Sequence, residues 1–140
     1  MNVLIAFDGS EHAERLLDWV AKSGFSQVTV LTVGPPQEVR EGRRRRGRSF
    51  SSRPGYALPD ELEKAVEKLE LVGVSASSLD KSGHVAKTIA ATAADGGFDL
   101  IVVGSARRHG WRKFFSRSIA EQIVGESPVS VLVVRSDVGG

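Results

Sequence analysis

One loop of the sequence concentrates residues that could hold a phosphate. Residues 104–119 read GSARRHGWRKFFSRSI; they begin at the end of an apolar run, LIVVG, and lead into a segment with helical periodicity, AEQIVGE. Where a strand runs through a loop into a helix, the first turn of the helix offers free N–H groups and a positive dipole end. The loop therefore either binds an anionic ligand or fills that place with its own cations, which are Arg107, Arg108, Arg112, Lys113 and Arg117.

Ser118 has a structural and a functional interpretation. It opens the tetrapeptide SIAE, which ends at Glu121 and fits the S-x-x-E capping box of a helix N-terminus. As a cap, its hydroxyl would accept a hydrogen bond from the first turn of the helix. As a ligand contact, the same hydroxyl would face a phosphate, and both roles can be filled by one residue.

Asp8 is the second candidate, at the end of the apolar run NVLIAF (2–7). In the context Asp8-Gly9-Ser10, the carboxylate could cap a turn or the start of the next helix. A carboxylate that ends the first strand could equally accept hydrogen bonds from the base or ribose of a nucleotide. The residues themselves leave both interpretations open.

Few other residues of the sequence are arranged in a pattern typical of a catalytic site. Neither G-x-x-x-x-G-K-[ST] nor, after the first apolar run, G-x-G-x-x-G occurs. The three histidines, His12, His84 and His109, fall in separate segments without metal-ligand spacing, and His84 reads as a surface residue before a helix. No cluster of acids suited to Mg²⁺ and no base other than Asp8 is visible. We therefore expect a protein that is not an enzyme, with slow ATP hydrolysis left open.

The candidates must be positioned by alternating strands and helices. Apolar, β-branched runs predict strands, and stripes at i, i+3, i+4 and i+7 predict helices. The weakest run, VSASSL, predicts an edge strand. The predicted strands are 2–7, 28–33, 74–79, 98–103 and 129–134, and the predicted helices cover the stripe 13–21 ended by Gly24, a helix restarting at Leu58-Pro59-Asp60, the stripe 85–93, and 118–125.

Strands that are apolar throughout, separated by helices, favour a parallel sheet covered on both faces. Right-handed crossovers then give an α/β fold, a doubly wound five-stranded sheet of order 3-2-1-4-5. Ligands of such sheets bind at the carboxyl ends of the strands where the order reverses, here between the first and fourth strands. That position brings Asp8 and the loop after Gly104 together.

Length and composition limit the remaining possibilities. The 140 residues, 41% hydrophobic and 26% charged, predict one domain over 1–140. The absence of cysteine fits a reducing compartment, and the N-terminal apolar run is too short for a signal peptide or membrane span. A cytoplasmic soluble protein is the expectation.

The longest irregular connection, 34–57, is rich in arginine, and it raises an alternative function. A net charge of only +2 and few interleaved aromatic residues argue against nucleic acid as a partner. Polyanion binding through this loop stays open as an alternative of another class. The arginines are Arg40, Arg43, Arg44, Arg45, Arg46, Arg48 and Arg53.

Three collinear segments together resemble the universal stress protein family over nearly the whole chain. They read NVLIAFDGSEHAERLLDWV, GHVAKTIAATAADGGFDLIVVGS and SRSIAEQIVGESPVSVLVV. The middle one is similar to the family segment G-x-P-A-x-x-I, with Val85 where proline is usual. The resemblance implies an adenine nucleotide alpha hydrolase-like fold.

The ATP-binding branch of that family carries G-x2-G-x9-G-[ST] after the fourth strand. This sequence keeps the frame, with Gly104 and Ser118 in place, but Arg107 and Arg117 stand where the second and third glycines belong. Arginine obstructs a backbone cradle and is strained at positive φ, yet it also binds phosphate in a bidentate manner. The two arginines therefore either replace backbone phosphate contacts or close the site.

By resemblance, the expected ligand is an adenine nucleotide, ATP or AMP, with Mg²⁺ only if ATP binds. The resemblance also implies a homodimer through the last strand (Val129 to Val134) and no membrane partner. A dimeric interaction module that binds no nucleotide is the alternative within the family. The expected nucleotide-binding residues are Ala6, Asp8, Val33, Gly104, Arg107, Arg117, Ser118 and Ile119.

Overall fold

The computed structural model describes residues 1–35, 56–105 and 117–135. Strands and helices alternate along these residues, as the apolar pattern predicts. Their order is β1 (Val3–Ala6), α1 (Glu11–Lys22), β2 (Gln27–Gly34), α3 (Pro59–Leu71), β3 (Ser75–Ser82), α4 (Val85–Asp95), β4 (Leu100–Ser105), α5 (Arg117–Glu126) and β5 (Ser130–Arg135).

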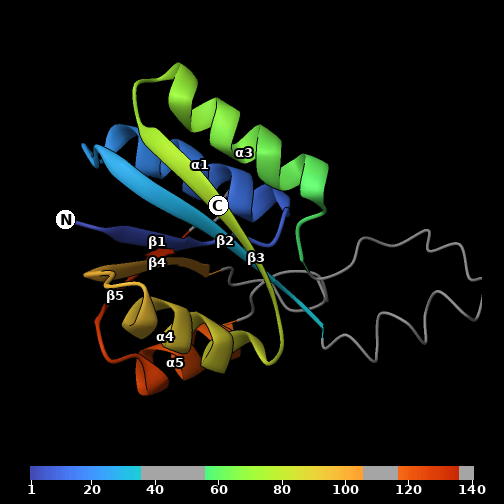
Figure 1. Ribbon diagram of the computed structural model, residues 1–140, viewed down its shortest axis with the longest axis vertical. Helices are drawn as coiled ribbons and strands as arrows, with labels where there is room; N and C mark the ends of the chain where they lie inside the picture. Colours follow the sequence, from blue (N-terminus) through green and yellow to red (C-terminus); the bar gives the residue numbers. More distant parts are fainter. Residues whose placement is uncertain (36–55, 106–116, 136–140) are drawn as a thin grey trace, which may run out of the picture.

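The described strands form one five-stranded sheet of order β3-β2-β1-β4-β5. All four pairings are parallel, and Ile5 at the centre lies between Val30 of β2 and Val102 of β4. Helices α1 and α3 cover one face and α4 and α5 the other (Figure 1). The predicted doubly wound fold and strand order are confirmed.

Each face of the sheet has its own apolar core. All of β1 is buried, and its side chains alternate between the two faces, as the pleat of a strand requires. Val3 and Ile5 belong to the cluster that includes residues of α1 and α3. Leu4 and Ala6 belong to the cluster formed with α4 and α5.

Helix ends follow the signals in the sequence. Ser10 is the N-cap of α1, and its hydroxyl oxygen accepts the Ala13 N–H at 3.1 Å. Pro59 is the first residue of α3, where the Leu58 N–H donates to Glu61 Oε1 at 3.1 Å. His84 is the exposed N-cap of α4, so its predicted surface position is confirmed. Val85 therefore occupies the first helical position, where proline is favoured.

Several predicted boundaries are wrong by one to three residues. Strand β4 begins at Leu100, because the Phe98 N–H donates to Ala93 O and still belongs to the turn that ends α4. Strand β5 begins at Ser130, because the Val129 N–H is taken by Ser127 Oγ in a local turn.

The bounds of β1 and β3 also differ from the prediction, whereas the place of β3 in the sheet agrees with it. Strand β1 is shorter than 2–7. Strand β3 runs on to Ser82. Its predicted position at the edge of the sheet is confirmed.

Among the helices within 1–35, 56–105 and 117–135, none has both the length and the apolar character needed to cross a bilayer.

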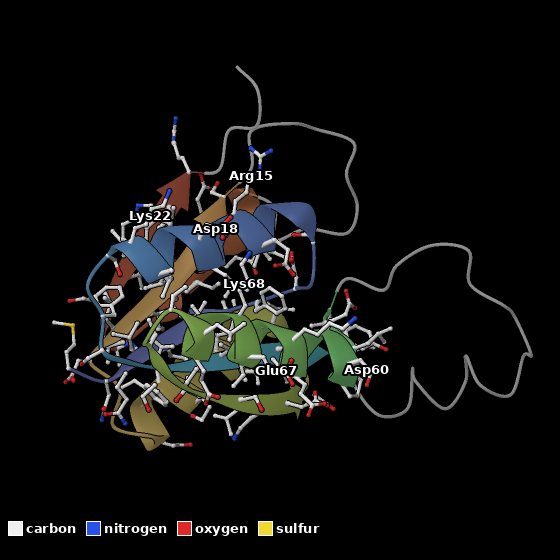
Figure 2. The ribbon with its side chains drawn as sticks, turned by 90° about the horizontal axis from the view of Figure 1, so that it is seen from above. Arg15, Asp18, Lys22, Asp60, Glu67 and Lys68 are labelled. Carbon is white, nitrogen blue, oxygen red and sulfur yellow. The ribbon has the colours of Figure 1, made fainter. Side chains whose placement is uncertain are left out.

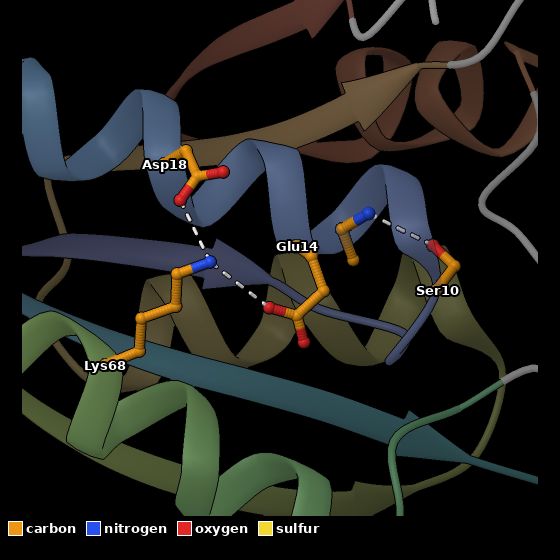
Figure 3. A network of polar contacts seen from close by, with 5 residues as sticks. Ser10, Glu14, Asp18 and Lys68 are labelled. Carbon is orange, nitrogen blue, oxygen red and sulfur yellow. Dashed lines mark hydrogen bonds and ion pairs between the residues drawn. The ribbon is translucent and has the colours of Figure 1, made fainter.

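An ion cluster links the two helices on one face of the sheet. Lys68 Nζ of α3 lies 2.9 Å from Asp18 Oδ1 and 3.5 Å from Glu14 Oε2 of α1 (Figures 2 and 3). The hydrogen bond to Asp18 is the main cause that raises the pKa of Lys68 above its ordinary 10.5, with the charges of Asp18 and Glu14 adding to it. The Lys68 side chain is 43% exposed, so solvent screening keeps the pairs weak.

We expect Lys68→Met to lower the free energy of unfolding at neutral pH by no more than about 1 kcal/mol. Because the folded-state pKa is the higher one, this contribution is complete below pH 10.5 and disappears as the pH rises through the folded-state pKa. Urea unfolding between neutral and alkaline pH measures it. Lys64→Met, at an exposed position one turn earlier in α3, is the control; an equal loss there would contradict an ion-pair origin.

Candidate functional site

The carboxyl ends of β1, β2 and β4 lie side by side at one end of the parallel strands (Figure 1). Ala6, the last residue of β1, is in register with Leu31 of β2 and Val103 of β4. Val33 therefore lies two residues beyond that level and Gly104 one residue beyond it. The fold brings together Ala6, Val33, Gly104 and the turn that carries Asp8, as the switch-point rule predicts.

Asp8 is buried, with 5% of its surface exposed, and it organises a tight turn. Its Oδ1 accepts the Ser10 N–H at 3.0 Å and the Ser10 hydroxyl at 2.6 Å. Ser10 in turn caps α1, as Figure 3 shows through its bond to the helix. The turn-capping interpretation of Asp8 is therefore observed, and the helix cap belongs to Ser10. A role of the carboxylate toward a nucleotide stays a prediction.

Gly9 is required at the centre of this turn for two reasons. Its φ is +78°, which disfavours residues with a side chain. A Cβ at this position would also lie 3.2 Å from Ala57 Cα and 3.1 Å from Glu61 Oε2. The chain that leads into α3 therefore packs directly against the turn that carries Asp8.

Thr32 is a polar residue of the site that sequence reasoning missed. Its side chain is buried in β2, next to Val33, and its Oγ1 accepts the Ala57 N–H at 2.9 Å. The sequence signals it only as one of the two threonines, Thr29 and Thr32, inside the apolar run VTVLTV. Its partner lies 25 residues away and could not be identified from spacing.

Gly104, in β4, is not required by packing. A Cβ there would meet Leu16 Cδ2 at 3.7 Å and Val134 O at 3.9 Å, which are ordinary van der Waals distances. Its φ also lies outside the left-handed region. A glycine there leaves the backbone accessible to close approach, and contact with a ligand at this position stays a prediction.

The remaining predicted residues lie at the start of α5 or outside the described residues. Helix α5 covers Arg117–Glu126, so Ser118 lies in its first turn, and both its capping role and its ligand role stay predictions. Ile119 is half-buried and lines a groove of about 400 Å³ between α4 and α5, together with His84, Val85, Ala86, Lys87, Gln122 and Glu126. Arg107, His109 and the arginines of 40–53 lie outside the described residues.

No metal centre is evident in the described part of the chain, where no group of three or more histidine, cysteine, aspartate or glutamate side chains gathers.

The strand β5 presents an apolar edge. It is the terminal strand of the sheet beside β4, with Val131 and Leu132 half-buried and Val133 38% exposed. The opposite terminal strand, β3, is instead rich in serine and charge, which protects an edge from pairing.

Comparison with known proteins identifies the relatives of this fold. The sequence model of the universal stress protein family matches residues 1–135. A universal stress protein of Bacillus subtilis, YxiE, is 28% identical over 153 aligned residues, which cover 95% of this chain and 97% of that protein.

Solved structures share the fold at low identity. A family protein of Arabidopsis thaliana with AMP bound has a TM-score of 0.68 at 18% identity, covering 99% of this chain and 93% of that one. A universal stress protein of Archaeoglobus fulgidus in complex with dAMP has a TM-score of 0.63 at 18% identity, covering 96% and 97%.

We expect Gly9→Ala to destabilise the protein more than Gly24→Ala does. Both glycines have positive φ, but a Cβ at Gly24 would meet nothing within 4 Å, so only the backbone term of about 1 kcal/mol applies there. At Gly9 the contacts with Ala57 and Glu61 add about 1–3 kcal/mol. Urea unfolding compares the two variants, and equal losses would contradict a close approach at Gly9.

Proposed function

The chain belongs to the universal stress protein family, and on that premise we propose that it binds an adenine nucleotide, ATP or AMP, as a regulatory ligand with little or no turnover. The observation that carries this proposal is the meeting of Asp8, Val33 and Gly104 at the switch point of the sheet. Structures of two family relatives hold AMP and dAMP, which supports the choice of an adenine nucleotide.

The residues divide into a base end and a phosphate end. At the base end, the backbone of Val33 and the carboxylate of Asp8 supply acceptors and donors for adenine or ribose, next to Ala6. At the phosphate end, the backbone at Gly104 and the N-terminus of α5, with Ser118 and Ile119, face the phosphates. Arg107 and Arg117 then replace the backbone contacts of two glycines with side-chain contacts to phosphate oxygens.

Our proposal of little or no turnover is supported by the hydrogen bonds of the Asp8 carboxylate. Oδ1 of Asp8 already accepts two hydrogen bonds from Ser10. These bonds hold the carboxylate in the turn, which supports a structural rather than a catalytic role for it. Mg²⁺ enters this proposal only as the usual companion of ATP.

We expect ATP and AMP to give saturable binding heat, with ATP the tighter ligand because it presents more charge to the arginines. Arg117→Ala should weaken ATP binding about tenfold, the scale of one charge-assisted hydrogen bond. Isothermal titration measures both. Arg15→Ala, on the outer side of α1, is the matched control (Figure 2).

Two results would count against this arrangement. No heat at millimolar ATP and AMP would overturn nucleotide binding altogether. Tighter ATP binding by Arg117→Ala would show that the arginine closes the site and does not hold a phosphate.

We also propose that the protein forms a homodimer through β5. An apolar strand at the edge of a sheet pairs readily with a second chain, and a closed two-fold pairing protects both edges. The exposed Val133 and the half-buried Val131 of β5 support this proposal, whereas the serine-rich β3 offers no comparable surface.

We expect the protein to have the mass of a dimer in light scattering at micromolar concentration, and Val133→Lys to convert it to a monomer. A lysine on the edge strand places an unpaired charge in the interface. Val72→Lys, at a valine 59% exposed in the turn after α3, should leave the dimer unchanged. A wild-type monomer would contradict the proposal.

A further inference from the structure

Thr32 has a buried hydroxyl near the carboxyl end of β2, where the nucleotide is proposed to bind. It is 1% exposed and precedes Val33, the residue whose backbone faces the base in that proposal. Its Oγ1 accepts the N–H of Ala57, which is itself 2% exposed. The bond joins the end of β2 to the segment that enters α3, between residues 25 positions apart in the sequence.

Ala57 transmits this anchoring to the turn that carries Asp8. Gly9 lies so close to Ala57 that a Cβ on it would be 3.2 Å from Ala57 Cα. On either side of Gly9, Asp8 and Ser10 are joined by two hydrogen bonds, so the three residues form one unit. A displacement of Ala57 would therefore change the packing against the turn that carries the carboxylate of Asp8.

Glu61 completes the wall against which the turn packs. Its Oε1 accepts the Leu58 N–H at 3.1 Å, and a Cβ on Gly9 would lie 3.1 Å from its Oε2. The position of Glu61 is thus fixed by the start of α3, which begins two residues after Ala57. The hydrogen bond from Ala57 to the Thr32 hydroxyl joins this corner to β2.

We infer that Thr32 is a positioning residue for Asp8 and thereby for the selection of adenine over guanine. This inference rests on the proposed function. A carboxylate accepts a hydrogen bond from the 6-amino group of adenine, whereas guanine presents the O6 acceptor at the same position. The discrimination depends on where the carboxylate lies, and Thr32 determines that through Ala57 and Gly9.

The test compares Thr32→Val with Thr32→Ser and with a matched control. Valine removes the acceptor and leaves the buried Ala57 N–H without it, while serine keeps the hydroxyl. The control is Thr92→Val in α4, another buried threonine, whose hydroxyl donates to Thr88 O at 2.7 Å. Thr32→Ala serves as a second variant, because the space it opens can admit a water to the Ala57 N–H.

Two readouts are measured on each variant that shows a cooperative thermal transition. The first is the affinity for AMP and for GMP by titration calorimetry. The second is the hydrogen exchange of the Ser10 amide, which reports the turn directly because that N–H donates to Asp8.

For Thr32→Val we expect AMP to bind about tenfold more weakly, with a smaller change for GMP, so that selectivity falls. The Ser10 amide should exchange faster. Thr32→Ser should stay within about twofold of the wild type on both readouts, and Thr92→Val should match the wild type even if its melting temperature falls.

The outcomes separate the inference from the proposed function. If the wild type binds AMP and Thr32→Val keeps its affinity and its AMP-to-GMP ratio, Thr32 is not a positioning residue. If the wild type binds no AMP, the proposed function fails and base selection fails with it. In that case, Ser10 exchange still decides whether Thr32 holds the turn, and unchanged exchange in Thr32→Val and Thr32→Ala would overturn that link too.

Discussion

Burial of the central strand on both faces is the constraint on which the rest of this structure depends. Every residue of β1 is buried, and its side chains pack alternately into the two apolar cores on either face of the sheet. A parallel strand in that position needs helices on both sides, and right-handed crossovers then send the chain outward in two directions. Those directions diverge at the carboxyl ends of β1 and β4. The location of the site is therefore a consequence of how the core is built.

Much of the fold could be predicted because local apolar patterns in the sequence determine most of its strands and helices. The runs that became β1, β2 and β4 have no competing period, and Ser10 and Pro59 mark helix starts by their own chemistry. Two of the boundary errors arose where a side chain or a turn competes with the strand for one N–H, at Phe98 and Val129. Such competition is a matter of single hydrogen bonds, which periodicity does not register.

The site was predictable only in part, for a related reason. The switch-point rule gives the position of Asp8, Val33 and Gly104, because it depends on topology alone. The hydrogen bond between Thr32 and Ala57 depends on two segments that meet across a long connection without any period. Nothing in the spacing of those residues indicates that they touch. The contribution of Gly9 was likewise visible as a turn signal, but not as a contact with the start of α3.

The bond between Thr32 and Ala57 also closes the connection between β2 and α3 at an entropic cost that depends only weakly on the length of that connection. Its two ends, at the close of β2 and the start of α3, are held at the sheet by described contacts that involve no residue of 36–55. The entropy of closing a loop grows slowly, by about 0.6 kcal/mol for each doubling of length. Because this entropy grows so slowly, the free energy of forming the bond between Thr32 and Ala57 depends little on how many residues separate them.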